Sequence, residues 1–246
     1  MPATPESSAE AADVAVENDY DSFAEGYAAE NETSLINAYY ARPAILNLAG
    51  DVAGRRILDA GCGAGPVSSA LRDRGAIVTG FDRSAKMVEL ARQRLGADAN
   101  LQVADITGPL PYPDGAFDDV VAALVLHYLE DWTAPLAELR RVLRPGGRLI
   151  VVVNHPIIFK MAYPKADYFA TSKWSEEYTF TGQKAVLTYW HRPLHAMTDA
   201  FTAAGFRTAV ISEPHPAEEA RELFPVLAKS PSGAFLSFLF FVLDTV

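Results

Sequence analysis

The middle of the chain alternates short apolar runs with segments in which apolar residues recur every three or four positions. Short β-branched runs predict strands, and the longer recurrence predicts helices. We expect strands over residues 56–60, 77–81, 101–104, 120–125 and 148–153, with helices over 67–74, 84–94 and from about 131 to 144. A further helix is expected over 195–204, with strands over 206–212 and 234–243. This alternation implies an α/β fold with a doubly wound sheet.

The segments that flank or interrupt this region differ from it in composition and in residue pattern. Residues 1–17 are mostly Ala, Glu, Ser and Pro and predict a disordered tail, because they offer little apolar surface to bury. Residues 18–48 carry aromatic and aliphatic residues at helical spacing. Residues 154–193 interrupt the strand and helix pattern with many Tyr, Phe and Trp residues. We therefore expect one domain over 18–246, with a helical lid over 18–50 and an aromatic cap over 154–193.

The first predicted strand runs into ILDAGCGAGP, residues 57–66, in which Gly61, Gly63 and Gly65 alternate. Glycines let the backbone approach a ligand closely because no side chain intervenes. A tight turn without a ligand is one interpretation. A dinucleotide site would need GxGxxG and an acid about 20 residues further on, for which Asp82 would serve. The spacing here is GxGxG, which does not fit that fingerprint.

An acid followed by GxGxG is the first motif of class I S-adenosylmethionine (SAM)-dependent methyltransferases, and the chain resembles this family at Asp59 and the three glycines. The resemblance continues at Asp82 in GFDRS, at Asp105 in VADI, and in LPYPDGAFDDVVAALVLHYLEDW and LRRVLRPGGRLIVVV, so that it covers residues 56–153. It implies a Rossmann-like sheet of seven strands in the order 3-2-1-4-5-7-6, with one strand antiparallel. It also implies that SAM is the cofactor and S-adenosylhomocysteine (SAH) its product.

The resemblance assigns roles to individual residues. Asp82 would hold the ribose hydroxyls and Asp105 the adenine amine, and carboxylates suit both tasks because they accept hydrogen bonds from these donors. The carbonyl of Leu124 would hold the cofactor amine, while Met87 would either pack on the adenine or simply belong to the core. The full set expected to bind the cofactor is Tyr20, Tyr27, Asp59, Ala60, Gly61, Gly63, Gly65, Asp82, Arg83, Met87, Ala104, Asp105, Ile106, Leu124 and His127.

Histidines are the candidate general bases, because they titrate near neutral pH. His127 follows the fourth predicted strand and His155 the fifth, and each could instead only line or orient the pocket. No metal is expected. His191 and His195 are four residues apart, but the proline between them interrupts the helix that would align their rings.

The substrate is expected to be a small, aromatic or hydrophobic metabolite of secondary metabolism, because the aromatic segment suits an apolar site. Tyr27, Trp174, Tyr178 and Trp190 are the candidate substrate-binding residues, although any one of them could simply pack the cap. Whether O, N or C accepts the methyl group stays open. Two alternatives remain: an enzyme that binds SAM without consuming it, in a cyclisation or elimination, and a non-catalytic SAM-binding partner subunit with residues 236–242 as an interface strand.

Composition and charge argue against several classes of partner. The formal net charge is −10 and no Lys/Arg cluster occurs, which argues against a nucleic-acid partner. A single cysteine, Cys62, fits a reducing compartment, and no apolar run is long enough for a membrane span. We expect a cytoplasmic protein without a membrane or nucleic-acid partner. A homodimer is one alternative for an oligomeric state that the sequence leaves open.

Overall fold

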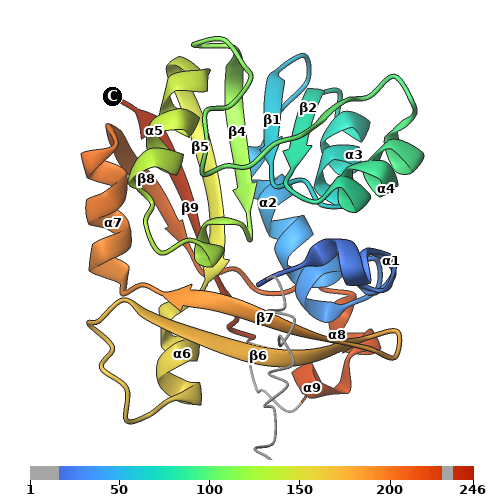
Figure 1. Ribbon diagram of the computed structural model, residues 1–246, viewed down its shortest axis with the longest axis vertical. Helices are drawn as coiled ribbons and strands as arrows, with labels where there is room; N and C mark the ends of the chain where they lie inside the picture. The colour runs from blue at the N-terminus through green and yellow to red at the C-terminus, as the bar shows by residue number, and fades with distance from the viewer. Residues whose placement is uncertain (1–16, 229–234) are drawn as a thin grey trace, which may run out of the picture.

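The computed structural model describes residues 17–228 and 235–246 (Figure 1). Of the tail predicted over residues 1–17, all but Glu17 therefore lies outside the described residues, as does the first residue of the strand predicted over 234–243. No helix in the described ranges is long and apolar enough to cross a bilayer.

The main sheet has seven strands, β3-β2-β1-β4-β5-β9-β8, which in chain order is the predicted order 3-2-1-4-5-7-6. Strands β1 to β5 pair in parallel, and β9 is antiparallel to both of its neighbours. The strands are β1 (Arg56–Ala60), β2 (Ile77–Asp82), β3 (Asn100–Val103), β4 (Phe117–Ala123), β5 (Leu143–Asn154), β8 (Phe206–Ser212) and β9 (Phe238–Thr245). The predicted α/β, Rossmann-like fold is confirmed.

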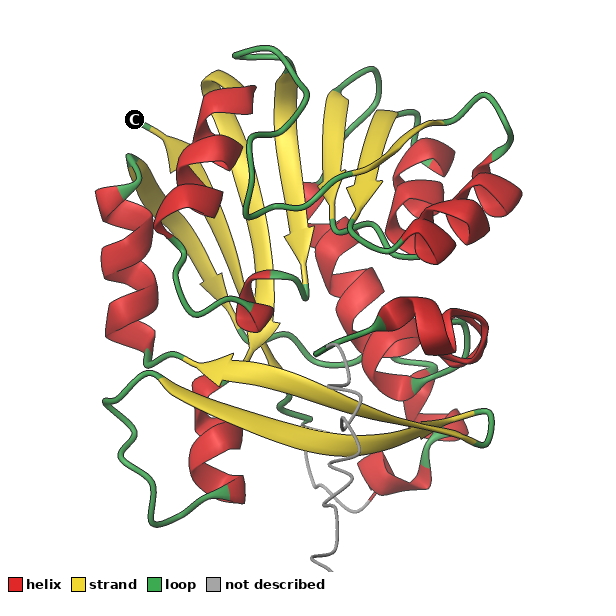
Figure 2. Cartoon of the chain, viewed as in Figure 1, coloured by secondary structure: helices red, strands yellow, loops and turns green. Residues whose placement is uncertain are grey.

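Helices cover both faces of this sheet (Figure 2). They include α2 (Arg42–Ala49), α3 (Pro66–Asp73), α4 (Ala85–Leu95), α5 (Thr133–Val142) and α7 (Leu194–Ala203). Successive strand residues point to opposite faces, so Leu58 joins the apolar layer with α5 and α7, and Ile57 joins the layer with α2 and α3. Ser84 caps the start of α4, and its hydroxyl accepts the N–H of Met87 at 3.0 Å.

Several boundaries differ from the sequence prediction; β9, for example, spans Phe238–Thr245 rather than 234–243. Strand β4 ends at Ala123 rather than Val125, because Leu124 has φ +58°, outside the extended region. Helix α5 ends at Val142, and β5 already begins at Leu143, which pairs with Phe117 beside an irregularity in the register with β4. The chain thus turns from helix to strand ahead of Pro145, Gly146 and Gly147.

The remaining elements gather at the carboxyl ends of the parallel strands (Figure 1). They are α1 (Tyr20–Asn31), the π-helix η1 (Asn37–Ala41), η2 (Leu126–Tyr128), α6 (Pro156–Ala162), the antiparallel hairpin β6 (Ser172–Phe180) and β7 (Gln183–His191), α8 (Ala220–Leu223) and α9 (Pro225–Ala228). An aromatic cluster joins α1 to the hairpin, since Phe23 stacks on Phe180 with ring centroids 5.3 Å apart. Segments far apart in sequence therefore enclose one edge of the sheet.

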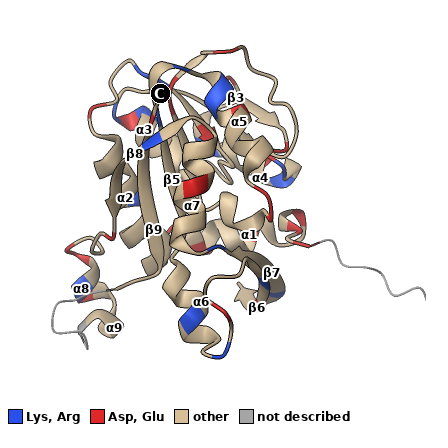
Figure 3. Ribbon diagram, turned by 90° about the vertical axis from the view of Figure 1, so that its left-hand side faces the viewer, with Lys and Arg blue, Asp and Glu red and all other residues tan. Residues whose placement is uncertain are grey.

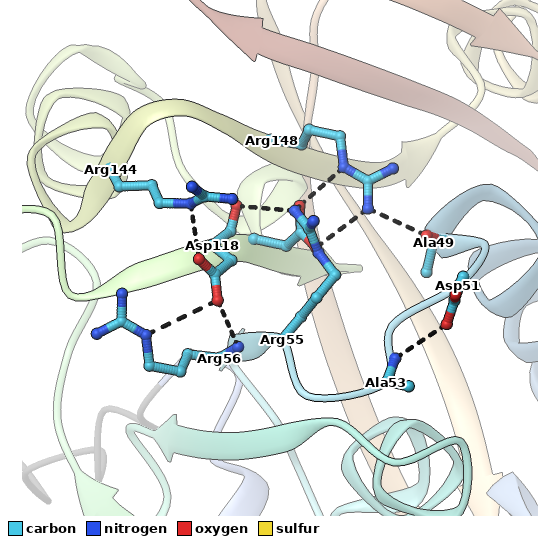
Figure 4. Close-up of polar contacts among 9 residues, drawn as sticks. Ala49, Asp51, Ala53, Arg55, Arg56, Asp118, Arg144 and Arg148 are labelled. Carbon is cyan, nitrogen blue, oxygen red and sulfur yellow. Dashed lines mark hydrogen bonds and ion pairs between the residues drawn. The ribbon is translucent and has the colours of Figure 1, made fainter.

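The opposite edge carries a cluster of ion pairs (Figure 4). Asp119 is 1% exposed and accepts hydrogen bonds from Arg55 Nη2 at 2.7 Å and Arg148 Nε at 2.8 Å. Burial acts to raise the pKa of Asp119, but these guanidinium groups outweigh it and hold the pKa below its ordinary value. Elsewhere the Lys and Arg residues are scattered over several elements in the view of Figure 3.

Candidate active site

The glycine loop after β1 has a backbone that side chains would obstruct. Gly61, Gly63 and Gly65 have φ values of +72°, +54° and +80°. A Cβ on Gly61 would lie 3.0 Å from Val125, and one on Gly65 would lie 3.3 Å from the Ala91 side chain. A Cβ on Gly63 would meet no atom within 4 Å, so this glycine borders open space. Gly61 and Gly65 thus serve close packing, while Gly63 leaves room beside the loop.

The loop is tied to the carboxyl end of β2. Asp82 Oδ2 accepts the N–H of Gly63 at 2.9 Å, and Asp82 Oδ1 accepts the N–H of Ser84 at 2.9 Å. Burial raises the pKa of Asp82, partly offset by these bonds. Each carboxylate oxygen keeps a lone pair for a further donor.

Two more acids stand at neighbouring strand ends. Asp59 is 1% exposed, accepts the Ser68 hydroxyl at 2.6 Å, and has a pKa raised to about 6 by burial. Asp105 is exposed, and its Oδ1 accepts both the N–H and the hydroxyl of Thr107 at 2.8 Å. The three predicted acids therefore meet at one edge of the sheet.

These groups line a cleft of about 1090 Å³, including its open part, which we call the glycine-loop cleft. Most residues predicted to bind the cofactor line it: Tyr20, Tyr27, Asp59, Gly61, Gly63, Asp82, Arg83, Met87, Ala104, Asp105, Ile106 and Leu124. Ala60, Gly65 and His127 do not line it. Ala60 ends β1 and is buried in the apolar layer with α5 and α7, and Gly65 packs on α4.

Sequence reasoning missed Arg42, which also lines this cleft from the start of α2. Its Nη2 donates to the carbonyl of Asn31 at 3.0 Å, whereas its Nε is buried without a hydrogen-bond partner. An unpaired buried guanidinium N–H is costly unless an acceptor reaches it. SAM carries a carboxylate on its methionine part, which could accept a hydrogen bond from Arg42 Nε. The residues at this end of the cleft therefore also fit SAM. No local motif marks Arg42, because it lies outside the glycine-loop region of the sequence.

A second cleft of about 880 Å³, the aromatic cleft, adjoins the first. The two share the wall residues Tyr20, Tyr27, Asn31, Asn37, Leu124 and Tyr128. Its other lining residues include His127, Asn154, Trp174, Glu176, Tyr178, Phe180 and Tyr189. The hairpin β6–β7 supplies half of the Phe, Tyr and Trp side chains that line this cleft, and its inner face follows the period of two along each strand.

Comparison with known proteins agrees with this geometry. Residues 58–151 match the family model described as a methyltransferase domain. The chain is 35% identical over 124 residues to a demethylmenaquinone methyltransferase of Tropheryma whipplei, covering 50% of this chain and 52% of that protein. A solved SAM-dependent methyltransferase of Mesorhizobium loti superposes with a TM-score of 0.64 at 24% identity, covering 87% of this chain and 99% of the other. Residues 58–151 are thus similar to a methyltransferase domain, and the chain shares the fold of solved SAM-dependent methyltransferases.

The chain spans about half the length of the curated relative it matches, and the family model ends before the hairpin. The fold is also shared with the [4+2]-cyclase SpnF, at a TM-score of 0.56 and 21% identity over 83% of this chain and 81% of that one. The match to a methyltransferase domain thus covers residues 58–151, while the aromatic cleft depends largely on segments outside it.

His127 lines the aromatic cleft. Its Nδ1 accepts the N–H of Asn154 at 3.2 Å, so in the neutral ring the proton sits on Nε2, which is buried without a partner. Burial lowers the pKa of His127 to about 3, with the carbonyl of Leu124 acting weakly in the other direction. The ring is therefore a neutral donor near pH 7, with its lone pair already engaged.

Like Ala60 and Gly65, the predicted residues His155 and Trp190 line neither cleft. His155 caps α6, since its Nδ1 accepts the N–H of Ile157 at 3.2 Å, and its Nε2 pairs with Glu213 at 2.7 Å. Trp190 follows Tyr189 on β7 and so points to the opposite face of the hairpin, where Lys173 lies 5.9 Å from its ring centroid. Of the predicted substrate residues, Tyr27, Trp174 and Tyr178 line the aromatic cleft.

One alternative role for the chain is wrong in a specific detail. In this alternative, a non-catalytic SAM-binding partner subunit uses residues 236–242 as an interface strand. Strand β9 instead lies between β5 and β8 and is hydrogen-bonded along both edges. It has no free edge to offer a partner.

Proposed function

We propose that the protein transfers a methyl group from SAM to a small molecule held in the aromatic cleft. The main support is that the two clefts share one wall. The glycine-loop cleft has polar side chains beside this wall, and the aromatic cleft has aromatic side chains. Such an arrangement suits a cofactor and a substrate that meet at the shared wall. Helix α1 would act as a lid and the hairpin as a cap, together forming one domain with residues 56–153.

The residues of the glycine-loop cleft suit the parts of SAM. Asp82 would accept hydrogen bonds from the ribose hydroxyls and Asp105 from the adenine amine, while Met87 and Ile106 offer an apolar surface to the base. Arg42 would donate to the methionine carboxylate through its unpaired Nε. Gly63 leaves its side of the loop open for the cofactor.

When bound, SAM supplies an electrophilic methyl group. The contribution of the protein is to align the acceptor and exclude water. Tyr20 and Tyr128 are joined by their hydroxyls at 2.5 Å on the shared wall, and Leu124 is held there by its N–H bond to the Val152 carbonyl at 2.8 Å. His127 would orient an acceptor atom of the substrate by donating from Nε2. A general-base role for His127 is disfavoured by its engaged Nδ1, and His155 has no part in the proposed site.

The proposal predicts tight SAM and SAH binding that depends on Asp82. Calorimetry with SAH should show that Asp82→Ala weakens binding about 10-fold or more, because a charge-assisted bond contributes roughly 1.5–3 kcal/mol. Asp199→Ala, which alters an exposed aspartate on α7, is the matched control and should bind SAH like the wild type. Unchanged affinity in Asp82→Ala contradicts the ribose assignment.

Turnover distinguishes the alternatives. Incubating the protein and SAM with small metabolites should form SAH in the same amount as a methylated product. A product formed without SAH indicates a cyclisation or elimination instead. SAM binding without any turnover supports a non-catalytic subunit. A cytoplasmic location and a role in secondary metabolism stay predictions from the sequence.

A further inference from the structure

We propose that the aromatic cleft selects substrates bearing a positively charged nitrogen, which Glu176 and the surrounding aromatic rings bind together. This rests on the proposed function, because it names the substrate class of the same site. The acidic residues Glu30 and Glu176 are the charged side chains among the described residues that line the aromatic cleft, and no Lys or Arg lines it.

The strand register places Glu176 inside the cleft. Trp174, Glu176 and Tyr178 alternate along β6 on the face that packs against α1, while Glu177 is exposed on the other face. A carboxylate among aromatic side chains loses hydration and is costly unless a donor or a cation compensates. The Tyr178 hydroxyl donates to Glu176 Oε2 at 2.5 Å. Among the described residues no Lys, Arg or His forms an ion pair with Glu176.

The hydroxyls around Glu176 form a directed chain. Tyr189 donates to Tyr178 at 3.3 Å, and Tyr178 donates to Glu176. Burial raises the pKa of both phenols, so they stay uncharged. This leaves the second oxygen of Glu176 able to accept from a ligand. Glu30 differs, since it is exposed and its Oε1 accepts the N–H of Thr181 at 3.3 Å.

The rings provide the second half of a cation site. Tyr128 stacks on Tyr189 at 5.3 Å between centroids, and Trp174 lies tilted at 5.0 Å from Tyr189. Aromatic faces attract an ammonium group within about 6 Å, most strongly when the group is desolvated. An anionic substrate would be repelled by Glu176, because no cation lies between them to compensate. A neutral substrate would leave the negative charge of Glu176 without a partner. Holding the substrate by a cation leaves a second substrate atom free to accept the methyl group.

Three phenyl compounds of similar size but different charge test the proposal. 2-Phenylethylamine is cationic at pH 7, 2-phenylethanol is neutral, and phenylacetate is anionic. Affinities are measured by calorimetry with and without saturating SAH. The amine should bind at least 10-fold more tightly than the alcohol, and phenylacetate should bind more weakly than either.

Two isosteric variants test whether the charge of Glu176 causes the preference for the amine. Glu176→Gln should lower amine affinity at least 10-fold while leaving the alcohol and SAH unchanged, because Gln keeps an acceptor for Tyr178. Glu177→Gln removes the same charge from the outer face and should leave all affinities unchanged. An amine that binds no better than the alcohol, including no measurable binding of either, overturns the proposal. Equal losses in both variants also overturn it, because they indicate a general charge effect.

The same data separate this inference from the methyltransferase proposal. SAH binding without a preference for the amine contradicts the cation site alone. A preference for the amine that depends on Glu176, without SAH binding, contradicts the proposed function and leaves the cation site supported.

Discussion

Replacing Asp59 with asparagine should stabilise the protein in the absence of SAM. Asp59 is 1% exposed, and its pKa is raised from 3.8 to about 6, chiefly by burial and further by the neighbouring charge of Asp82. At neutral pH the carboxylate is ionised in a site that disfavours its charge. An asparagine side chain at this position would be neutral at every pH and could still accept the Ser68 hydroxyl.

The size of the effect follows from the two pKa values of Asp59. A difference of about two pH units between the folded and unfolded states corresponds to roughly 3 kcal/mol. The folded state holds its proton more tightly, so the contribution of Asp59 to stability is full below pH 3.8, falls as pH rises toward 6, and is constant above. We expect Asp59→Asn to gain about 3 kcal/mol at pH 7.5, or roughly 6–12 °C in Tm for a chain of this size.

Chemical denaturation of both proteins between pH 4 and pH 8 measures this gain. It should be near zero at pH 4, rise between pH 4 and 6, and stay level above. Asp199→Asn removes an exposed aspartate on α7 and should show no such pH-dependent gain. A gain that is the same at pH 4 and pH 7.5, or no gain at all, would refute the reasoning from burial.

Three further predictions follow from other parts of the molecule. Gly63→Ala and Gly54→Ala both place a Cβ at positive φ with no atom within 4 Å. Each should lower the free energy of unfolding, measured by denaturation, by about 1–2 kcal/mol. Only Gly63→Ala should also weaken SAH binding in calorimetry. Asp119→Asn should lower stability at pH 7 by up to about 3–5 kcal/mol, since it removes the buried carboxylate that pairs with two partly buried guanidinium groups, and should leave SAH affinity unchanged; a loss below about 1 kcal/mol contradicts this. The imidazole NMR signals of His127, assigned with His127→Gln, should stay those of the Nε2–H tautomer from pH 5 to 8, and a transition near pH 6.5 would contradict the burial argument.

The central domain was predictable because its signals are local. The short apolar runs of the strands, the helical spacing between them and the GxGxG loop each occupy a few consecutive residues. Parallel strands bring their carboxyl ends to one edge, so Asp59, Asp82 and Asp105 could be placed together from the order of elements alone. The structure shows all three lining one cleft.

The substrate side was less predictable because aromatic residues occupy both faces of the hairpin. Tyr189 and Trp190 are neighbours, and nothing local indicates which one points inward. The packing of α1 against the hairpin selects the face with Trp174, Tyr178 and Tyr189. The same choice brings Glu176 in and leaves Glu177 out.

The sequence by itself determined the alternation of strands and helices, the glycine loop and the acids beside it, because each depends on local backbone preference or on short connections in a parallel sheet. The strand order came from the resemblance to the SAM-dependent methyltransferases. Only the tertiary structure decided which side chains complete the two clefts. Arg42 reaches the glycine-loop cleft from α2, and His127 rather than His155 borders the aromatic cleft. These placements depend on how distant segments pack, and packing depends on shape and burial across the whole fold rather than on neighbours in the chain.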